Sequence, residues 1–287
     1  FLQGTVFWGL FTLGHDCGHS SFSRYPTVNW IMGVILHSAI LTPFESWRIS
    51  HRHHHKNTGN IDTDEVFYPH RDPTGGNDPE LSRVRSLAAF LGASWFVYLF
   101  TGFKPRGVNH FNPYDPLFAR HVAAVAGSLG GWMIAMGSCV WSISTFGFAT
   151  VAAYYLAPIL MYATWLVVTT FLHHNDEETL WFAADNWDYV KGNLSSVDRD
   201  YGIFNNVIHN IGTHQVHHLF PIIPHYKLVE TTTHFRKAFP HLVRISHDSI
   251  VQAFVKNIRD YVNYGFVGED TKMHSIAMAK ARAQKSD

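Results

Sequence analysis

The most extended feature of the hydrophobic pattern is a charge-free stretch in the middle of the chain. Residues 121–175 run for 55 positions without a single Asp, Glu, Lys or Arg. A helix needs about 20 apolar residues to cross the hydrocarbon core of a membrane. The stretch is therefore long enough for two crossings, with STFGF at 144–148 as the predicted turn. We expect a membrane hairpin over about 121–172, because a core helix of a soluble protein rarely runs this long without a charge.

Three shorter apolar stretches are ambiguous by length. Residues 1–14 are interpreted as the end of a helix, and residues 25–44 and 86–103 are borderline for a crossing. Each of the latter two could cross the membrane, lie in its interface or re-enter. In the long stretch, Gly127 and Gly131 form a small face that would let a neighbouring helix approach closely.

The remaining segments are polar. Residues 104–120 are rich in Pro and Asn and predict a loop, and residues 176–213 carry acidic groups and turn formers. Residues 226–287 predict helices that end in a solvated, frayed tail. Because no repeat or low-complexity segment divides the chain, we expect one domain over 1–287. It starts at Phe1 rather than Met, so we expect its N-terminus to be truncated.

Composition narrows the class of protein. Lys plus Arg and Asp plus Glu number 22 each, and this balance argues against nucleic acid as a partner, because phosphate binding needs a cationic excess. The two cysteines, Cys17 and Cys139, are too few for a disulfide framework and fit a reducing compartment. Histidine is unusually frequent, with 21 copies, and its positions are informative.

Three short histidine clusters have helical spacing. HDCGH places two histidines four positions apart, and HRHHH and HQVHH each place three at i, i+3 and i+4. These offsets put the side chains on one face of a helix, where imidazoles can converge on a metal ion. Imidazole suits iron, zinc, copper and nickel. The candidate ligands are His15, His19, His51, His54, His55, His214, His217 and His218.

A single such cluster has ordinary explanations, since it could be a capped or buried pair or a solvated patch. Three clusters, two of them with identical spacing, are much harder to explain in that way. Eight histidines also exceed the four ligands of a structural zinc ion. The count therefore favours two metal ions in one dinuclear site.

A shared site restricts the membrane topology. If residues 25–44 crossed once, the first and second clusters would lie on opposite faces, and the same argument excludes a single crossing by residues 86–103. Both stretches should therefore be interfacial or re-entrant. The neighbouring basic residues fall on the cluster side, which the positive-inside rule makes cytoplasmic. They are Arg24, Arg48, Arg52, Lys56, Lys104, Arg106 and Arg120.

The amino-acid sequences of these motifs resemble those of a known family. HDCGH, HRHHH and HQVHH, separated by apolar stretches, resemble the three histidine boxes of membrane fatty acid desaturases. The phrases HDCGHSSFS, SHRHHHKNTGNIDTDEVFYP, VKGNLSSVDRDYG and IGTHQVHHLFPIIPHYKL resemble the methyl-end group, which comprises delta-12 and omega-3 enzymes. IGTHQVHHLFPIIPHYKLVE and FLHHNDEETLWF are most similar to omega-3 desaturases of the oomycete type. The resemblance covers nearly the whole chain.

The resemblance implies an all-α integral membrane bundle of four helices, with interfacial helices and a cytosolic histidine-rich cap. The enzyme would insert a cis double bond near the methyl end of an acyl chain carried by a phospholipid or by CoA. It would use two iron ions, O2, and electrons from cytochrome b5 and its reductase, in the endoplasmic reticulum membrane.

A further histidine completes the metal shell in this family, near the end of the last membrane helix. His174 is the preferred candidate, with His173 and His209 as alternatives. His53 falls outside the HxxHH pattern of its cluster and is expected to face elsewhere. Carboxylates that could orient the ligands are Asp16, Asp64, Glu65, Asp176 and Asp200.

A tunnel for an apolar chain should lead from the bilayer to the iron ions. Trp47, Trp95, Trp165 and Trp181 could line it, although tryptophans in such chains are more often core or interface anchors. Cys17 is expected to be a small packing residue.

Alternative functions share part of the evidence. Delta-12 desaturation, or hydroxylation on the same scaffold, would use the same boxes. A histidine-rich metal transporter would place its ligands at mid-depth in membrane helices, whereas these clusters adjoin arginines and polar loops. A carboxylate-bridged di-iron bundle requires Glu-x-x-His motifs, and the boxes contain none.

Overall fold

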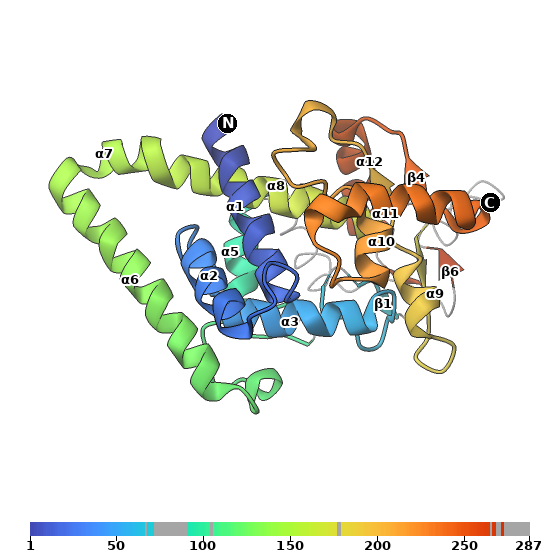
Figure 1. Ribbon diagram of the computed structural model, residues 1–287, viewed down its shortest axis with the longest axis horizontal. Coiled ribbons are helices and arrows are strands. Elements are labelled where there is room, and N and C mark those ends of the chain that lie inside the picture. The colour runs from blue at the N-terminus through green and yellow to red at the C-terminus, as the bar shows by residue number, and fades with distance from the viewer. Residues whose placement is uncertain are drawn as a thin grey trace, which may run out of the picture.

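The computed structural model describes residues 1–66, 68–71, 91–103, 106–176, 179–264, 266–267 and 271–272, and these are predominantly helical. A long helical hairpin projects to one side of the molecule, and short helices and strands gather at the other end (Figure 1). The expected all-α class is confirmed at this level, since the strands are short two-residue pairs. The expected frayed tail and Lys104 lie outside the described residues.

The predicted hairpin consists of α6 (Val122–Phe146) and a second helical run made of α7 (Phe148–Val151), a π-helical turn (Ala152–Leu156) and α8 (Ala157–His174). Among the described residues, two helical runs are long and apolar enough to cross a membrane, and they are Val122–Phe146 and Phe148–His174. The chain reverses at Gly147, whose φ of +83° suits glycine. Pro158 lacks an N–H group, and the π-turn ends two residues before it.

The shorter apolar stretches form helices below the length of a crossing. α2 (Pro26–Ser38) has 13 residues and α5 (Gly92–Thr101) has 10, which correspond to about 20 Å and about 15 Å. Both fall short of the roughly 30 Å hydrocarbon core. α2 packs against α1 (Leu2–Gly18) and α6, and α5 packs against α8. The interfacial or re-entrant placement of both stretches stays a prediction, and residues 86–90 of the second stretch lie outside the described residues.

The predicted small face of α6 is used in one of these contacts. A Cβ atom on Gly131 would lie 2.6 Å from Cγ1 of Val34 on α2, so the glycine permits the close approach. A Cβ atom on Gly127 would lie 3.6 Å from the ring of Trp30. The face therefore joins the hairpin to α2.

The far end of the molecule carries the histidine-bearing helices and their supports. α3 (Phe44–Asn57) holds the second cluster and α10 (His214–Leu219) holds the third. The other short helices are α9 (Tyr189–Asn193), α11 (His225–Ala238), α12 (Ile250–Tyr264) and the 3-10 turns Pro116–Phe118, Gly202–Phe204 and Pro240–Leu242.

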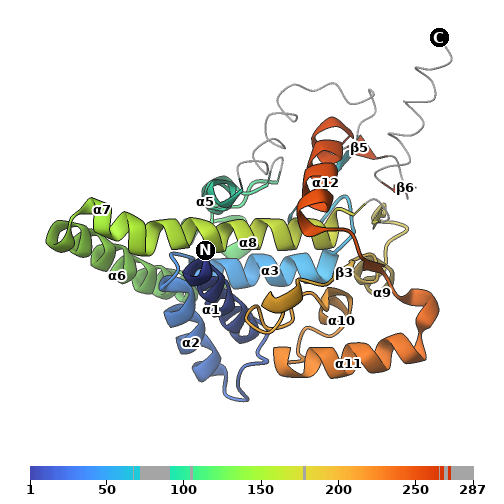
Figure 2. The same ribbon diagram turned by 90° about the horizontal axis from the view of Figure 1, so that it is seen from above.

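Short strands link distant parts of this end. β1 (His70–Arg71) pairs in parallel with β5 (Phe266–Val267), and β3 (Asp198–Arg199) pairs in parallel with β4 (Ile245–Ser246). β2 (Leu180–Trp181) is antiparallel to β6 (Thr271–Lys272). Seen from above, α10 and α11 lie at the same end of the molecule as the C-terminus of α8 (Figure 2).

The main apolar core lies where α1, α5 and α8 meet. It includes Trp8, Trp95, Leu99, Tyr162 and Leu166, all of them buried. Two polar groups in this core are paired with each other, since Trp95 Nε1 donates to the Tyr162 hydroxyl at 2.8 Å. This core fixes the C-terminal ends of α1 and α8, which carry histidines, next to one another.

Candidate metal centre

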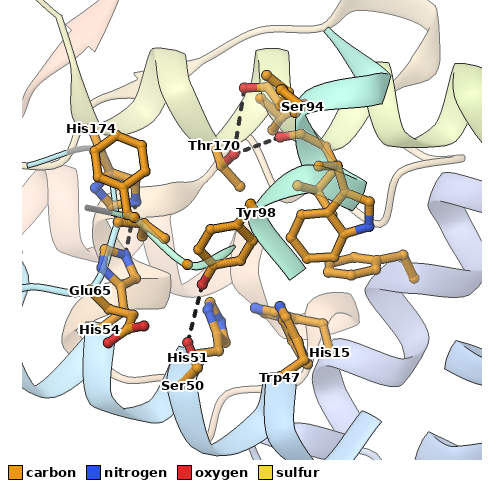
Figure 3. A pocket seen from close by; sticks show the side chains of 18 of the residues that line it. His15, Trp47, Ser50, His51, His54, Glu65, Ser94, Tyr98, Thr170 and His174 are labelled. Atoms are coloured by element: carbon orange, nitrogen blue, oxygen red, sulfur yellow. Dashed lines mark hydrogen bonds between the residues drawn. The ribbon is translucent and has the colours of Figure 1, made fainter. Parts of the chain in front are cut away.

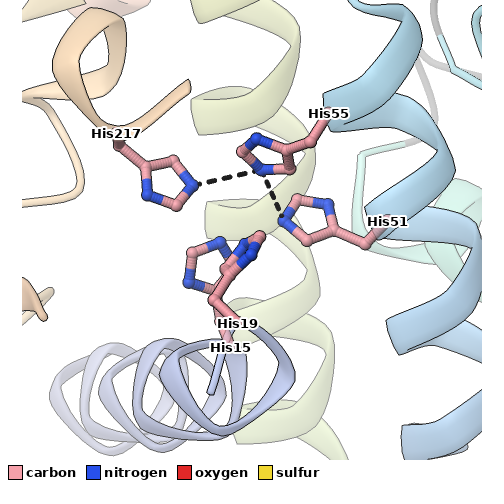
Figure 4. A group of neighbouring side chains, drawn as sticks. All are labelled: His15, His19, His51, His55 and His217. Atoms are coloured by element: carbon pink, nitrogen blue, oxygen red, sulfur yellow. Dashed lines mark hydrogen bonds between the residues drawn. The ribbon is translucent and has the colours of Figure 1, made fainter. Parts of the chain in front are cut away.

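All nine histidines predicted as metal ligands converge in the fold. Five of them form one group whose ligand nitrogens lie within 4.8 Å of one another, and three more form a second such group. The ninth, His214, lies against the second group. The first group, drawn in Figure 4, is His15, His19, His51, His55 and His217, and the second contains His54, His174 and His218.

The first group joins three elements that are distant in sequence. His15 and His19 come from the C-terminal end of α1, His51 and His55 from one face of α3, and His217 from α10. The Nε2 atom of His55 lies 3.1 Å from Nε2 of His51 and 3.2 Å from Nε2 of His217. The i, i+4 spacing therefore brings both histidines of each pair on α1 and α3 into the same group.

The second group lies at the end of the membrane hairpin. His174, the last residue of α8, has its Nε2 atom 3.3 Å from Nε2 of His54 and 3.0 Å from Nε2 of His214. The Nε2 atom of His218 lies 2.9 Å from that of His214. Four imidazoles thus surround one point. The two groups touch, because the rings of His55 and His218 stack with centroids 4.1 Å apart.

The remaining ring nitrogens show which tautomers are present. Nδ1 of His54 donates to Oδ1 of Asp64 at 2.6 Å, and Nδ1 of His218 donates to Oδ1 of Asn193 at 3.0 Å. Once Nδ1 carries the proton, Nε2 has only a lone pair, and it is directed into the group. Partners of this kind orient metal-bound histidines and raise their basicity.

These features fit metal ions. Several nitrogen lone pairs that converge within about 3 Å repel one another unless a cation lies between them. Protonation is disfavoured, since burial lowers the pKa of His217 to about 4 and lowers the pKa values of His51, His55, His214 and His218 well below the usual value. Neutral imidazole is the form that binds a metal. The two groups can therefore hold two metal ions with nitrogen ligands.

The alternative candidates for the ninth ligand lie elsewhere. Nδ1 of His173 donates to the carbonyl of Val197, and its Nε2 lies 3.1 Å from the hydroxyl of Tyr201, so both nitrogens are engaged outside the groups. His209 packs against the ring of His225. His53 points toward Glu65, 3.7 Å away, and belongs to neither group.

The candidate carboxylates have different environments. Asp64 contacts a histidine of the second group directly. Asp16 accepts the Nδ1–H of His225 at 2.7 Å and lies 4.0 Å from Nδ1 of His15. Asp176 pairs with Arg199, and Asp200 is exposed and accepts the Gly202 N–H. Asp64 and Asp16 are therefore the two that adjoin predicted ligands.

Sequence reasoning missed two neighbours of His218. Asn193, in the quoted phrase VKGNLSSVDRDYG, and Thr58, in HKNTGN, both reach its Nδ1 atom, at 3.0 Å and 3.1 Å. The residues predicted to orient the histidines were all carboxylates, although amide and hydroxyl oxygens accept imidazole protons equally well. A wider search within the same phrases would have included both.

Local structure explains why α10 can present three histidines with only six residues. The side-chain amide of Gln215 donates to the carbonyls of Leu194 and Leu242, and its backbone N–H donates to Oδ1 of Asp198 at 2.8 Å. Asp198 also accepts from Arg236 of α11 at 2.8 Å. The short helix is therefore held by its surroundings and not by its own length.

An apolar cavity of about 250 Å³ opens onto the histidines (Figure 3). Its polar end includes His15, His51, His54, His174 and His214, from both groups. Its wall is formed largely by α1, α5 and α8. Trp47 and Trp95 line it, together with Trp8 and Phe11. Trp165 and Trp181 do not line it.

A buried cluster of imidazoles at the end of an apolar helical hairpin, open to an apolar cavity, fits a metalloenzyme associated with a membrane. Comparison with known proteins gives the family. The fatty acid desaturase profile matches residues 1–248, and the chain belongs to the fatty acid desaturase family.

Several relatives are named omega-3 desaturases. The chain is 42% identical over 260 residues to the sn-1 acyl-lipid omega-3 desaturase (ferredoxin) of Synechocystis, covering 89% of this chain and 71% of the relative. It is 42% identical over 245 residues to the acyl-lipid omega-3 desaturase (cytochrome b5), endoplasmic reticulum, of Arabidopsis thaliana, covering 84% and 62%. It is 39% identical over 299 residues to the omega-3 fatty acid desaturase, endoplasmic reticulum, of Vigna radiata, covering 98% and 78%.

The chain thus spans between 62% and 78% of the lengths of these three relatives. Their names agree on the position of the double bond and differ in the electron donor, which is ferredoxin for one and cytochrome b5 for another.

Proposed function

We propose that this protein is an omega-3 fatty acid desaturase that inserts a cis double bond near the methyl end of a polyunsaturated acyl chain. The observation that carries the proposal is the convergence of nine histidines in two touching groups at the end of an apolar cavity. The names of its relatives, at about 40% identity, support the position of the bond.

Two iron ions bound by the nine histidines would supply the oxidising power for breaking unactivated C–H bonds. The residues of the chain bind the substrate and position the metal ligands. The apolar wall binds the methylene chain and excludes water, and the ends of α1, α3, α8 and α10 hold the imidazoles in place. Asp64 keeps a proton on Nδ1 of His54, so that Nε2 remains free to bind a metal ion.

The reaction also requires O2 and two electrons. We propose cytochrome b5, with its reductase, as the donor, as in the Arabidopsis relative's name. The acyl chain would arrive as part of a phospholipid or as a CoA ester. We further propose that the protein is integral to the endoplasmic reticulum membrane, with the histidine groups on the cytosolic side. Basic residues next to the groups support that orientation.

The test is expression of the full-length protein in yeast supplied with defined fatty acids, followed by mass spectrometry of the products. A new double bond three carbons from the methyl end is the expected result. A double bond at the delta-12 position of a monounsaturated chain would make the enzyme a delta-12 desaturase. A hydroxyl group without a new bond would make it a hydroxylase.

Two ligand variants make the same test specific for the metal centre. His54→Ala and His217→Ala should abolish the product, because each removes an imidazole from one of the groups. The matched control is His53→Ala, on the same helix but outside both groups, which should keep its iron. Normal product from either ligand variant would contradict the proposal.

A further inference from the structure

One buried acidic residue beside the metal centre has no part in holding metal. Glu65 lies in the loop after α3, and the residue is only 4% exposed. It lines the same cavity as His51, His54 and His174 (Figure 3). The two histidine groups contain no carboxylate, so Glu65 faces the reaction space without belonging to either group.

Among the described residues, the charges around Glu65 do not neutralise it. Arg106 is the nearest guanidinium, but its N–H groups donate to the carbonyl oxygens of Asp64 and Ile61, and its plane stacks on the ring of Tyr68. Asp64 and Asp115 add negative charge nearby.

Among the described residues, His53 is a further ionisable neighbour, and its Nδ1 atom lies 3.7 Å from Oε2 of Glu65. A buried carboxyl group that lies near other carboxylates, with the nearby guanidinium bonded elsewhere, prefers its neutral, protonated form. Burial and the adjacent Asp64 raise the pKa of Glu65 to about 8.

Hydroxyl groups extend from Glu65 along the cavity wall. Ser50, one residue before the second histidine cluster, lines the cavity together with Glu65. The Ser50 Oγ atom lies 3.2 Å from the hydroxyl of Tyr98 on α5, and all three residues line the cavity. Each member of this chain can both donate and accept a proton.

The proposed desaturation needs groups that can supply protons. Removing two hydrogen atoms from –CH2–CH2– while O2 is reduced to two molecules of water consumes two electrons and two protons. The electrons come from the donor protein, and the protons must enter a cavity whose wall is otherwise mainly apolar.

From this geometry we infer that Glu65 is the proton donor for oxygen reduction at the metal centre, with the hydrogen-bonded hydroxyl groups of Ser50 and Tyr98 beside it on the cavity wall. The O–H bond of the Glu65 carboxyl breaks, its proton passes to oxygen on the way to water, and the carboxylate is reprotonated from solvent before the next turnover. This assignment rests on the proposed desaturase function.

The test compares iron-loaded wild-type enzyme with Glu65→Gln, which keeps the shape of the side chain but carries no transferable proton. We expect kcat to fall by about 100-fold or more, with unchanged KM for the acyl substrate and unchanged iron per chain. Glu65→Asp should recover part of the rate. Glu230→Gln, an exposed residue on α11, is the matched control and should behave as wild type.

A second measurement does not depend on turnover. Bound iron favours the ionised carboxylate, so the infrared spectrum is recorded on the iron-loaded resting enzyme at pH 7. We expect a protonated-carboxyl band that is absent from Glu65→Gln. Wild-type kcat in Glu65→Gln, loss of its iron, or no such band in the wild type would each overturn the assignment. If the wild type forms no double bond, the proposed function fails, and the band still reports the state of Glu65.

Discussion

At the scale of single residues, the second nitrogen of each imidazole decides what the first can do. His54 illustrates this, because Asp64 accepts its Nδ1 proton and leaves Nε2 directed at His174. Asp64 is itself held, since it also accepts the backbone N–H groups of Gly59 and Glu65. A fully buried carboxylate with three donors has a fixed orientation and fixes its histidine in turn.

Replacing Asp64 by Asn should therefore weaken iron binding. The amide NH2 group can face the ring and favour the tautomer with the proton on Nε2, which cannot bind metal through that atom. We expect a 10–100-fold loss of affinity for the ion in the second group, measured as iron per chain after dialysis against graded chelator. Asp200→Asn is the control, because Asp200 is exposed and contacts neither group. Equal iron retention in the two variants would contradict this role.

The sequence identified the candidate histidines and favoured His174 over His173 and His209, but it gave no geometric reason for that preference. The i, i+3, i+4 spacing identified eight candidates because helical geometry is local. His173 and His174 are consecutive on α8 and differ by a rotation of about 100° around the helix. Only the packing of α8 against Val197 and Tyr201 directs His173 away from the groups.

At the scale of helices, the position of the first cluster depends on how closely α1 packs against α2. Gly14 directly precedes His15, and a Cβ atom there would lie 2.2 Å from Cδ2 of His37 on α2. The Nε2–H of His37 in turn donates to the carbonyl of Phe11 on α1 at 3.1 Å. Its ring also stacks on that of Phe11.

Gly14→Ala should consequently push α1 and α2 apart. We expect a loss of about 1–3 kcal/mol in the free energy of unfolding, with reduced iron because His15 and His19 shift with α1. Thermal unfolding in detergent and iron per chain would measure this. Gly130→Ala on α6 is the matched control, because nothing lies within 4 Å of its added Cβ atom. A Gly14→Ala protein with wild-type stability and iron would show that the interface can relax.

At the scale of the whole molecule, the turn of the hairpin and the histidine groups lie at opposite ends. The turn at Gly147, flanked by exposed Phe146 and Phe148, is remote from α10 and α11 (Figure 1). If the charge-free helices span the bilayer, this turn emerges on the side opposite the histidine groups.

A glycosylation acceptor in a short insertion at Gly147 should therefore be modified in endoplasmic reticulum membranes. The same insertion after Ser20, near the first cluster, or after Pro240, beyond the third, should remain unmodified. A shift in electrophoretic mobility that a glycosidase reverses is the measurement. Modification of one of the two cluster-side positions but not the other would overturn the shared-side argument for the three clusters.

Acid should destabilise the metal-free protein as a whole. In the fold, burial lowers the pKa of His217 to about 4, while in the unfolded chain it returns to its usual value of about 6.5. Between these values the unfolded chain binds more protons, so the free energy of unfolding falls as the pH is lowered from 6.5 toward 4. His51, His55, His214 and His218 shift in the same direction.

The measurement is the unfolding temperature of chelator-treated protein in detergent at several pH values. We expect it to fall steadily below pH 6.5, with a shallower slope in His217→Gln, which lacks one of the titrating groups. In the loaded protein, iron should be released over the same range, because protons compete for the ligand nitrogens. An unfolding temperature that is constant or higher in acid would contradict this account.

The sequence alone determined the features that depend on local rules. The length of the charge-free stretch identified the hairpin, residues 144–148 its turn, and helical spacing the candidate ligands. The short apolar stretches were placed by a parity argument, and that placement stays a prediction.

Only the tertiary structure decided features that depend on contacts between distant segments. It divided the histidines into groups of five and three, with His214 against the second, because α1, α3, α8 and α10 meet at angles that no spacing encodes. It paired Asn193 with His218 and placed Glu65 beside the cavity. Such contacts join side chains separated by many residues, and their geometry is set by packing of the whole core.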